Sequence, residues 1–313
     1  MVNLKDLAKK DDLFVSGHDL CPGCGIPVIL KIVLRTTNNP IIAANASGCL
    51  QSASTTFPAT SWRLNWIHTA MENAAATMSG IQAACSALKK QGKLPGEKEI
   101  NFLVIGGDGS TYDTGLRSIS SAMERGENFV YLCYDNQMYA CSGGQRSSAS
   151  PMGAATATTP SGKILPGKLQ PRKNIVDIFA AHKIPYVAQS APWLWQDLYR
   201  KAGKAFEIPG PAFINVLTPC PYRWKIPTNK SIEITKLAVD TCAWPIYEIE
   251  NGTKVTVNYK PKKKLPVTAW LQPQARFTHL FKAENNWIVK KIQEEIDEEW
   301  NFLLSSENKN RIN

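Results

Sequence analysis

The chain has 313 residues, 43% of them hydrophobic, and a formal net charge of +10. This is enough for one large domain or two ordinary domains with a buried core. Its apolar runs stay shorter than the roughly 18–20 residues that a membrane helix needs. Its first residues, M-V-N-L-K-D-L-A-K-K, lack the apolar stretch of a signal peptide. We therefore expect a soluble, cytoplasmic protein.

The positive charge and the cysteines each have more than one explanation. Part of the charge is the run Lys260–Lys264, which suits nucleic-acid binding, docking of an acidic partner, or plain solvation. No nucleic-acid-binding motif accompanies it, so we favour docking or solvation. Eight cysteines in a reducing compartment predict a metal, a cluster or simple burial rather than disulfides.

Helical and strand patterns alternate along the chain. The predicted helices are Pro27–Arg35, Thr69–Leu88, Tyr112–Gly126, Asn174–His182 and Leu194–Phe206. The predicted strands are Ile41–Asn45, Asn101–Ile105, Phe129–Tyr134, Tyr186–Ala188 and Ala212–Leu217. The strands are apolar throughout, which is typical of a parallel sheet buried on both sides. The predicted fold class is therefore α/β, a mostly parallel sheet covered by helices on both faces.

Two regions depart from this alternation. From about residue 229, proline, lysine and a polar helix over Ala283–Leu304 dominate. We expect residues 1–228 to form the α/β domain and residues 229–313 an extension that wraps the domain or a partner subunit. The segment Ser142–Arg172 shows no periodicity, and a loop of this length inside a compact domain is usually functional.

The run I-G-G-D-G-S at Ile105–Ser110 is the most informative motif. It follows one predicted strand, and Asp135-Asn136 follows the next one along the chain. Glycines let backbone N–H groups approach phosphate oxygens, and a carboxylate with an amide oxygen suits Mg²⁺. The pattern predicts a diphosphate site with Mg²⁺, although two ordinary β-turns would also produce it. Ligands of parallel sheets bind at the carboxyl ends of strands, where Gly48, Gly107, Asn136 and Thr218 are expected to converge.

Four cysteines lie in turns next to Gly or Pro, as metal or cluster ligands usually do. They are Cys21, Cys24, Cys49 and Cys220. Four thiolates can hold a structural zinc or a [4Fe–4S] cluster. A second C-x-x-C, usual for zinc, is missing, which favours the cluster. Three other cysteines fit small buried hydrophobic positions, namely Cys85, Cys133 and Cys242.

Seven motifs together resemble the β subunit of 2-oxoacid:ferredoxin oxidoreductases, in the pyruvate and oxalate branch with separate subunits. They are C-P-G-C-G at 21–25, A-S-G-C-L at 46–50, W-I-H-T-A-M-E-N-A-A at 66–75, G-G-D-G-S-T-Y-D-T-G-L at 106–116, D-N-Q-M-Y at 135–139, G-G-Q-R-S-S at 143–148 and T-P-C-P at 218–221. The G-D-G and the later asparagine also resemble the thiamine diphosphate fingerprint. The resemblance runs from about residue 14 to residue 280.

This resemblance implies cofactors and ligands. A [4Fe–4S] cluster would be held by Cys21, Cys24, Cys49 and Cys220. Thiamine diphosphate would be bound through Mg²⁺ and through contacts with Gly48, Gly107 and Gly109. The Mg²⁺ ligands would be Asp108, Asn136 and the backbone carbonyl of Met138. The implied reaction is the oxidative decarboxylation of a small 2-oxoacid.

The resemblance also implies partners. An α subunit would supply the pyrimidine half of the cofactor site, including the glutamate that activates the aminopyrimidine. A γ subunit and a ferredoxin-like δ subunit, separate or fused, would complete the complex and carry electrons to ferredoxin. Coenzyme A would be needed for pyruvate and not for oxalate. No nucleic acid and no membrane partner is expected.

Four further residues are candidates for catalysis. Close pyruvate-type relatives usually read Y-M-N-T-G where this chain reads Y-A-C-S-G, so Cys141 replaces an asparagine that faces the substrate. Oxalate then becomes a candidate substrate beside pyruvate, unless the exchange is neutral. His68 and Glu72, four residues apart on the predicted helix, would tune the aminopyrimidine or carry protons, or would be merely structural. Arg146 would contact the substrate carboxylate or, as we prefer, order its loop.

Two other kinds of protein share parts of these patterns. A non-redox thiamine diphosphate lyase or carboligase would have the same diphosphate motif but no use for four cysteines. A basic nucleic-acid-binding protein with a Cys₄ zinc would explain the charge and the thiols, although it would leave the G-D-G motif without a role.

Overall fold

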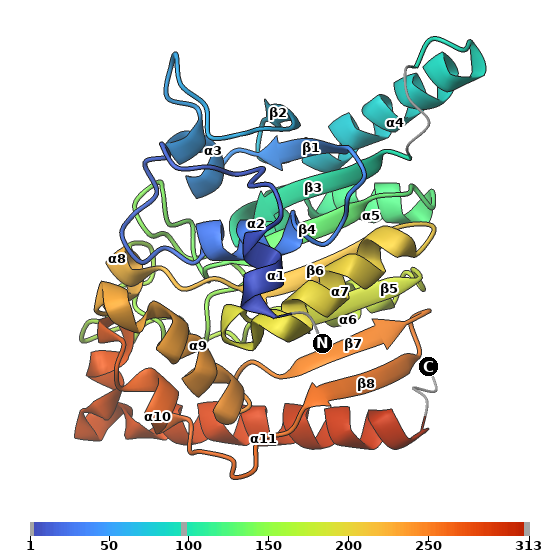
Figure 1. Cartoon of the computed structure of the whole chain (residues 1–313). Helices are drawn as coiled ribbons and strands as arrows, with labels where there is room; N and C mark the ends of the chain where they lie inside the picture. Colours follow the sequence, from blue (N-terminus) through green and yellow to red (C-terminus); the bar gives the residue numbers. More distant parts are fainter. Residues whose placement is uncertain (1–2, 95–98, 310–313) are drawn as a thin grey trace.

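A computed structural model gives the fold and describes residues 3–94 and 99–309. Its strands are β1 (Ile41–Ala46), β2 (Asn65–Thr69), β3 (Asn101–Gly107), β4 (Val130–Asp135), β5 (Tyr186–Ser190), β6 (Ala212–Leu217), β7 (Ile246–Glu250) and β8 (Lys254–Tyr259). They form one sheet in the order β2-β1-β3-β4-β6-β5-β7-β8 (Figure 1). The strands β1 to β6 pair in parallel, whereas β7 and β8 are antiparallel. All five predicted strands and the mostly parallel sheet are confirmed.

Helices cover both faces of this sheet. They are α1 (Leu4–Ala8), α2 (Ile26–Val33), α3 (Cys49–Ser54), α4 (Ala74–Lys90), α5 (Leu116–Glu124), α6 (Ile175–Ala180), α7 (Trp195–Glu207), α8 (Pro221–Trp224), α9 (Ser231–Asp240), α10 (Thr268–Leu271) and α11 (Asn286–Lys309). No helix in the described part of the chain is long and apolar enough to cross a bilayer.

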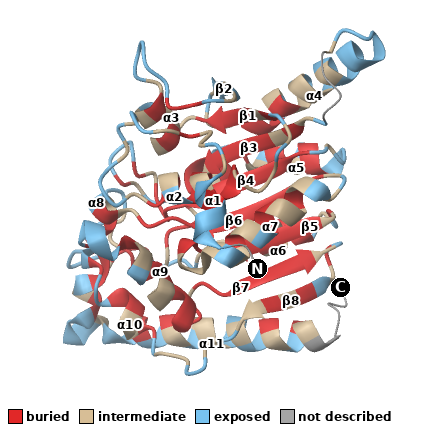
Figure 2. Cartoon of the chain, in the orientation of Figure 1, coloured by how far each residue is buried: buried red, intermediate tan, exposed pale blue. Residues whose placement is uncertain are grey.

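Successive residues of the central strands feed two separate hydrophobic layers. Leu103 and Ile105 of β3 pack in the layer that contains α2 and α7, whereas Val104 packs in the layer with α4, α5 and α6. This alternation follows from the period of two residues in a strand. Because both faces are covered, the central strands are buried almost throughout (Figure 2). That burial explains their uninterrupted apolar sequences.

The predicted helix Thr69–Leu88 is wrong at its start. Residues Asn65–Thr69 form β2, which pairs in parallel with β1, and the helix begins only at Ala74. The segment N-W-I-H-T contains aromatic and β-branched residues, which favour a strand. Its helix-like spacing merges with the alanine-rich sequence that follows, so the two elements are hard to separate.

The predicted helix Tyr112–Gly126 also differs at its start. The chain first makes a π-helical turn over Gly109–Thr114 and then α5. Single π turns are frequent at functional sites. The expected end is confirmed, because Gly126 has φ +70°, a conformation that favours glycine.

The region after residue 229 continues the same sheet. Strand β7 pairs with β5, β8 pairs with β7 at the outer edge of the sheet, and α11 runs along β8 (Figure 1). A third hydrophobic layer joins this region to the segment after β4, and it contains Met138, Trp224, Trp244 and Trp270. The region therefore packs on the α/β core. The division at residue 228 and a role in contacting a partner subunit stay predictions.

Candidate active site

Four neighbouring strands carry the predicted site residues. Strands β1, β3, β4 and β6 are adjacent in the sheet, and all four run in the same direction. Their carboxyl ends lead into Gly48, Asp108, Asn136 and Thr218. The structure therefore brings these four positions to one edge of the sheet, on the left in Figure 1, as the sequence predicts.

Three oxygen-bearing groups face one another at this edge. One side of the Asn136 amide lies 2.7 Å from the carbonyl oxygen of Met138 and 3.2 Å from Oδ1 of Asp108. The amide oxygen occupies that side, where it meets only acceptors, and turning the amide would let its nitrogen donate to both. Three converging oxygens without a donor suit a hard cation. This donor set fits Mg²⁺ and leaves other positions for phosphate oxygens.

Asp108 is held in this place by buried neighbours. Its side chain is buried, and Ser147 donates a hydrogen bond of 2.5 Å to its Oδ2. Burial and the nearby Asp135 carboxylate raise the pKa of Asp108 well above its ordinary value. A divalent cation at the site would counter both effects, because it stabilises the ionised carboxylate. Ser147 belongs to the long loop after β4 and to the motif G-G-Q-R-S-S at 143–148, but the sequence alone indicates no role for it.

The glycines around Asp108 have no room for a side chain. A Cβ at Gly109 would lie 2.3 Å from Cε1 of Tyr139, and a Cβ at Gly107 would lie 3.0 Å from Cε2 of Tyr134. A Cβ at Gly48 would lie 2.6 Å from the Tyr134 hydroxyl. Such close packing of backbone against aromatic rings requires glycine. The three positions are therefore sterically demanding, and their contacts with a cofactor stay predictions.

The predicted cluster ligands share one pocket. Its volume is about 330 Å³, and its lining includes Cys21, Cys24, Cys49, Cys220 and also Cys141. All eight cysteines of the chain are free. The segment C-P-G-C-G is fixed against the segment after β6, because Gly25 donates its N–H to the carbonyl of Pro219 at 3.3 Å. Gly23, with φ +73°, packs against the backbone of Thr228 so closely that no side chain fits.

The surroundings of Cys24 and Cys220 favour protonated thiols in the absence of a metal. Burial, with the neighbouring thiols of Cys220 and Cys21, raises the pKa of Cys24 to about 12. Burial also raises the pKa of Cys220. Iron binding would reverse this by stabilising the thiolates. Within the described residues, no three His, Cys, Asp or Glu side chains are placed to hold a single metal ion. A [4Fe–4S] cluster spreads four thiolates over four irons, so a wider arrangement around one pocket fits it.

Cys141 lies against one of the predicted ligands. The thiols of Cys49 and Cys141 are hydrogen-bonded, which raises the pKa of Cys49 and lowers that of Cys141. The guanidinium of Arg223 is nearby, and its Nε donates to the carbonyl of Ala140 at 2.8 Å. Cys141 therefore stands between the thiol pocket and solvent, where it is exposed.

The remaining catalytic candidates are placed differently from expectation. His68 and Glu72 are not on one helix, since His68 lies in β2 and Glu72 in the turn before α4. His68 is exposed and its ring stacks on Trp66, whereas Glu72 is half-buried. Arg146 is exposed, and its backbone N–H donates to Thr158 at 2.9 Å. That contact lies within the loop. Catalytic roles for all three stay predictions.

Another polar residue at this edge had no signal in the sequence. Asn45 is fully buried at the end of β1, inside the apolar run I-I-A-A-N-A. Its Nδ2 donates to the carbonyls of Ala46 and Ile105, at 2.7 and 3.3 Å, and its Oδ1 has no hydrogen-bond partner. Only the strand pairing shows that this asparagine lies beside the site.

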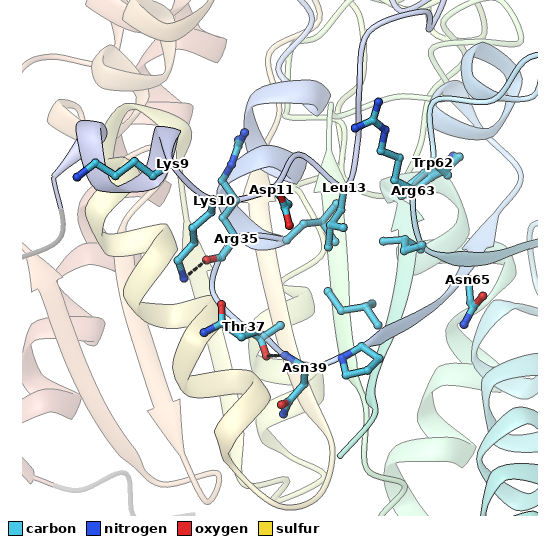
Figure 3. Close-up of a pocket in the computed structure, with 15 residues that line it drawn as sticks. Lys9, Lys10, Asp11, Leu13, Arg35, Thr37, Asn39, Trp62, Arg63 and Asn65 are labelled. Carbon is cyan, nitrogen blue, oxygen red and sulfur yellow. Dashed lines mark hydrogen bonds between the residues drawn. The ribbon is translucent and has the colours of Figure 1, made fainter. Parts of the chain in front are cut away.

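A cavity larger than the thiol pocket lies elsewhere. It has a volume of about 880 Å³ and is lined by residues at the amino ends of β1 and β2, including Ile41 and Asn65 (Figure 3). This is the edge of the sheet opposite to the predicted ligands. Lys10, which points into the same region, donates to the carbonyl of Arg35 at 2.7 Å. None of the predicted site residues lines this cavity.

Comparison with known proteins defines the class first. Residues 46–216 match the family described as thiamine pyrophosphate enzyme, C-terminal TPP binding domain. This stretch runs from the last residue of β1 to the last but one of β6 and includes the predicted Mg²⁺ ligands. The fold is thus that of a thiamine-pyrophosphate-binding domain.

Relatives that are similar over nearly the whole chain show which group of these proteins the chain belongs to. The chain is 46% identical to pyruvate synthase subunit PorB of Methanocaldococcus jannaschii, over 94% of this chain and 97% of that protein. It is 43% identical to PorB of Thermotoga maritima, over 98% and 97%. It is 38% identical to ketoisovalerate oxidoreductase subunit VorB of Pyrococcus abyssi, over 94% and 93%. The chain belongs to the 2-oxoacid:ferredoxin oxidoreductases, as a β subunit, and the predicted resemblance is confirmed.

A solved structure supports the fold. It is the 2-oxoglutarate:ferredoxin oxidoreductase from Magnetococcus marinus with 2-oxoglutarate, coenzyme A and succinyl-CoA bound. The TM-score is 0.54 at 24% identity, over 66% of this chain and 67% of that one. This likeness concerns the arrangement of helices and strands.

Proposed function

We propose that this chain, together with partner subunits, oxidatively decarboxylates a small 2-oxoacid with thiamine diphosphate, Mg²⁺ and a [4Fe–4S] cluster, and passes the electrons to ferredoxin. One observation carries the proposal. Asn136 lines the pocket of the cysteines while its amide faces Asp108 and Met138. A cation-bound diphosphate and an electron acceptor held by this chain would therefore be immediate neighbours.

The residues of the chain would divide the work between them. Asp108, Asn136 and Met138 would hold Mg²⁺, and Ser147 would keep the carboxylate of Asp108 in one orientation. The cofactor, when bound, supplies a thiazolium ring that takes up the electron pair left when CO₂ departs. Four cysteines from three segments would hold the cluster within the same edge of the sheet. Asp108, Asn136 and Met138 are buried, which would limit the access of water to the oxygen site.

The first substrate candidate is pyruvate. Relatives 43–46% identical over nearly the whole chain are named pyruvate synthase subunits. Pyruvate and coenzyme A would give acetyl-coenzyme A and CO₂, with two electrons released. A relative at 38% identity is named a ketoisovalerate oxidoreductase subunit, so a branched 2-oxoacid belongs in the same assay.

A second candidate, oxalate, is favoured by Cys141. In the resemblance described above, this position holds an asparagine that faces the substrate. Here a thiol in contact with Cys49 and close to Arg223 takes its place. Oxalate would give two CO₂ and two electrons, with no acyl group to transfer and no need for coenzyme A. The nearby guanidinium would favour a dianion.

The proposed partners would supply the parts of the cofactor site and of the electron path that are not assigned to this chain. An α subunit would bring the pyrimidine half of the cofactor site, and γ and ferredoxin-like δ subunits would complete the complex. The net charge of +10 would help to attract anionic substrates and an acidic ferredoxin, as an effect on association rate.

The test is dye reduction by the complex, purified anaerobically with its partner chains. Oxalate without coenzyme A is compared with pyruvate and with 2-oxoisovalerate, each with coenzyme A. Reduction with pyruvate alone supports the first candidate, and reduction with oxalate alone supports the second. A complex that contains iron and acid-labile sulfide but reduces dye with none of them contradicts the proposed substrate class. Zinc in place of iron contradicts the cluster.

The variant Cys141→Asn separates the two substrates further. If Cys141 sets the preference, the variant shifts turnover from oxalate toward pyruvate while the iron content stays the same. Unchanged substrate preference would show that the exchange is neutral.

A further inference from the structure

We propose that Arg276 is a positioning residue that holds the Mg²⁺ loop, residues 136–138, in its binding conformation. The inference rests on the proposed function, and it assigns a role to a residue outside the predicted ligands. Arg276 lies in a 3₁₀-helix over Ala275–Phe281, in the region that was expected to be an extension. Its contact with the loop spans 139 residues of sequence.

The loop contains a residue in an unfavourable conformation. Gln137, between Asn136 and Met138, has φ +65°, a region that residues with side chains rarely adopt unless the surroundings hold them there. Its N–H donates to Oδ1 of Asp135 at 2.9 Å, and its carbonyl accepts from Oγ of Ser150 at 2.7 Å. The backbone dihedral angles of Gln137 set the direction in which the chain continues into Met138, and they therefore help to place the Met138 carbonyl beside Asn136.

Arg276 restrains this residue through its side chain. Nη2 of Arg276 donates to Oε1 of Gln137 at 2.5 Å, and Gln137 is only 1% exposed. Nε of Arg276 donates to Gln274 at 2.9 Å, which fixes the guanidinium from the other side. The side chain of Gln137 is thus bound between the core and a rigid donor.

Arg276 also restrains the neighbouring residue indirectly. Its guanidinium stacks 4.1 Å from the ring centroid of Trp224, and Nε1 of Trp224 donates to the backbone carbonyl of Asn136 at 3.0 Å. Arg276 therefore supports two successive residues of the loop, one directly and one through an indole ring.

The burial of Arg276 requires a compensating role. The residue is only 4% exposed, no ion pair within the described part of the chain includes it, and its Nη1 has no hydrogen-bond partner. A buried charge without a carboxylate partner is costly. The contacts that hold this buried guanidinium are its hydrogen bonds to Gln137 and Gln274 and its stacking on Trp224. Part of the cost of burying the charge is therefore offset by contacts with the Mg²⁺ loop and with the indole that supports it.

The experiment measures metal binding instead of turnover. The complex with its partner chains is stripped of divalent cations and thiamine diphosphate. Mn²⁺ is then titrated in the presence of thiamine diphosphate, and free Mn²⁺ is followed by electron paramagnetic resonance. The variants are Arg276→Met, Gln137→Met, the double variant and Arg276→Lys. Leu271→Ala, a truncation of an apolar side chain in the same hydrophobic layer, serves as the control for lost stability.

We expect Arg276→Met and Gln137→Met each to weaken Mn²⁺ binding by about tenfold to a hundredfold, the usual loss when a residue behind a metal ligand is removed. The double variant should be no worse than either, because both remove one interaction. Arg276→Lys should recover part of the Mn²⁺ affinity. Leu271→Ala should lower Tm and leave the Mn²⁺ affinity at the wild-type value. Variants of Arg276 that lower Tm but keep wild-type Mn²⁺ affinity would overturn the inference. Failure of the wild-type complex to bind Mn²⁺ with thiamine diphosphate would instead overturn the proposed function.

Discussion

Ser147 donates a hydrogen bond to Oδ2 of Asp108 across 39 residues of sequence. The contact fastens the long loop after β4 to the end of β3. We expect Ser147→Ala to weaken thiamine diphosphate binding by about tenfold, because a buried carboxylate loses one of its few donors. Calorimetric titration with the cofactor and Mg²⁺ would measure this. Ser148→Ala is a matched control, since Ser148 contacts Asp113 through its backbone N–H, which alanine keeps. Equal losses in both variants would contradict a specific role for Ser147.

Removal of the carboxylate should abolish cofactor binding without touching the cluster. In Asp108→Ala the oxygens of Asn136 and Met138 remain, but the only charged ligand of the three is lost. We expect no thiamine diphosphate in the purified complex, together with an unchanged iron and sulfide content and an unchanged signal of the reduced cluster.

The reciprocal variant is Cys21→Ser. It should remove the cluster while thiamine diphosphate still binds, because Cys21 lines the thiol pocket and not the oxygen site. Loss of both cofactors in either variant would mean that the two sites depend on each other, contrary to the arrangement proposed.

The packing of Tyr139 on Gly109 predicts a strong steric effect. In Gly109→Ala the new Cβ would stand 2.3 Å from the ring, so the ring or the π turn must move. We expect destabilisation by about 1–3 kcal/mol and roughly tenfold weaker cofactor binding, measured by thermal unfolding and titration. For comparison, Gly80→Ala in α4 places a Cβ in open space. It should stabilise the chain by about 0.5–1 kcal/mol through helix propensity.

The lowered pKa of Glu248 leads to a prediction of how the stability of the fold depends on pH. Burial opposes its ionisation, but hydrogen bonds from Arg200 and Lys204 outweigh burial and lower the pKa of Glu248 from 4.5 to about 2. A carboxyl whose pKa is lowered in the folded state stabilises the fold at pH values above 4.5, and this contribution disappears as the pH falls toward 2.

We therefore expect Glu248→Gln to lower the free energy of unfolding by about 2 kcal/mol near pH 7, with the difference from wild type vanishing in acid. Urea unfolding of both proteins, from near pH 7 down to the acid range in which Glu248 becomes protonated, measures this difference in free energy. Glu233→Gln breaks the exposed ion pair with Lys230 and should leave the unfolding curve unchanged. A difference for Glu248→Gln that persists undiminished in acid would contradict the assignment.

The strands that could be predicted from the sequence are those that are buried on both faces of the sheet. The run I-I-A-A-N-A of β1 and the run A-F-I-N-V-L of β6 lie between covered faces, and their apolar sequences show it. Strand β7 was not predicted, because I-Y-E-I-E carries two glutamates. Their charges are matched by Arg200 and Lys204 from α7, a pairing that only the folded chain reveals.

Some residues of the candidate site could also be predicted from the sequence, and others could not. Cys21 and Cys24, like Gly107 and Asp108, are close in sequence, so their spacing by itself indicates their chemistry. Ser147 and Arg276 contact the site from 39 and 139 positions away in the sequence. Although Ser147 lies in the motif G-G-Q-R-S-S, no local pattern shows which residue either side chain contacts. The misplaced His68 shows the converse, since a spacing of four residues has meaning only if the segment is a helix.

The distance in sequence between Gln137 and Arg276 also bears on the order of events during synthesis. A nascent chain that has reached residue 228 already contains every proposed metal ligand. It still lacks β7, β8 and the 3₁₀-helix that carries Arg276. Its metal-binding loop would therefore lack the support of Arg276 until the last part of the chain emerges from the ribosome. Cofactor capture would then begin late, at the stage when the chain is nearly complete and ready to meet its partner subunits.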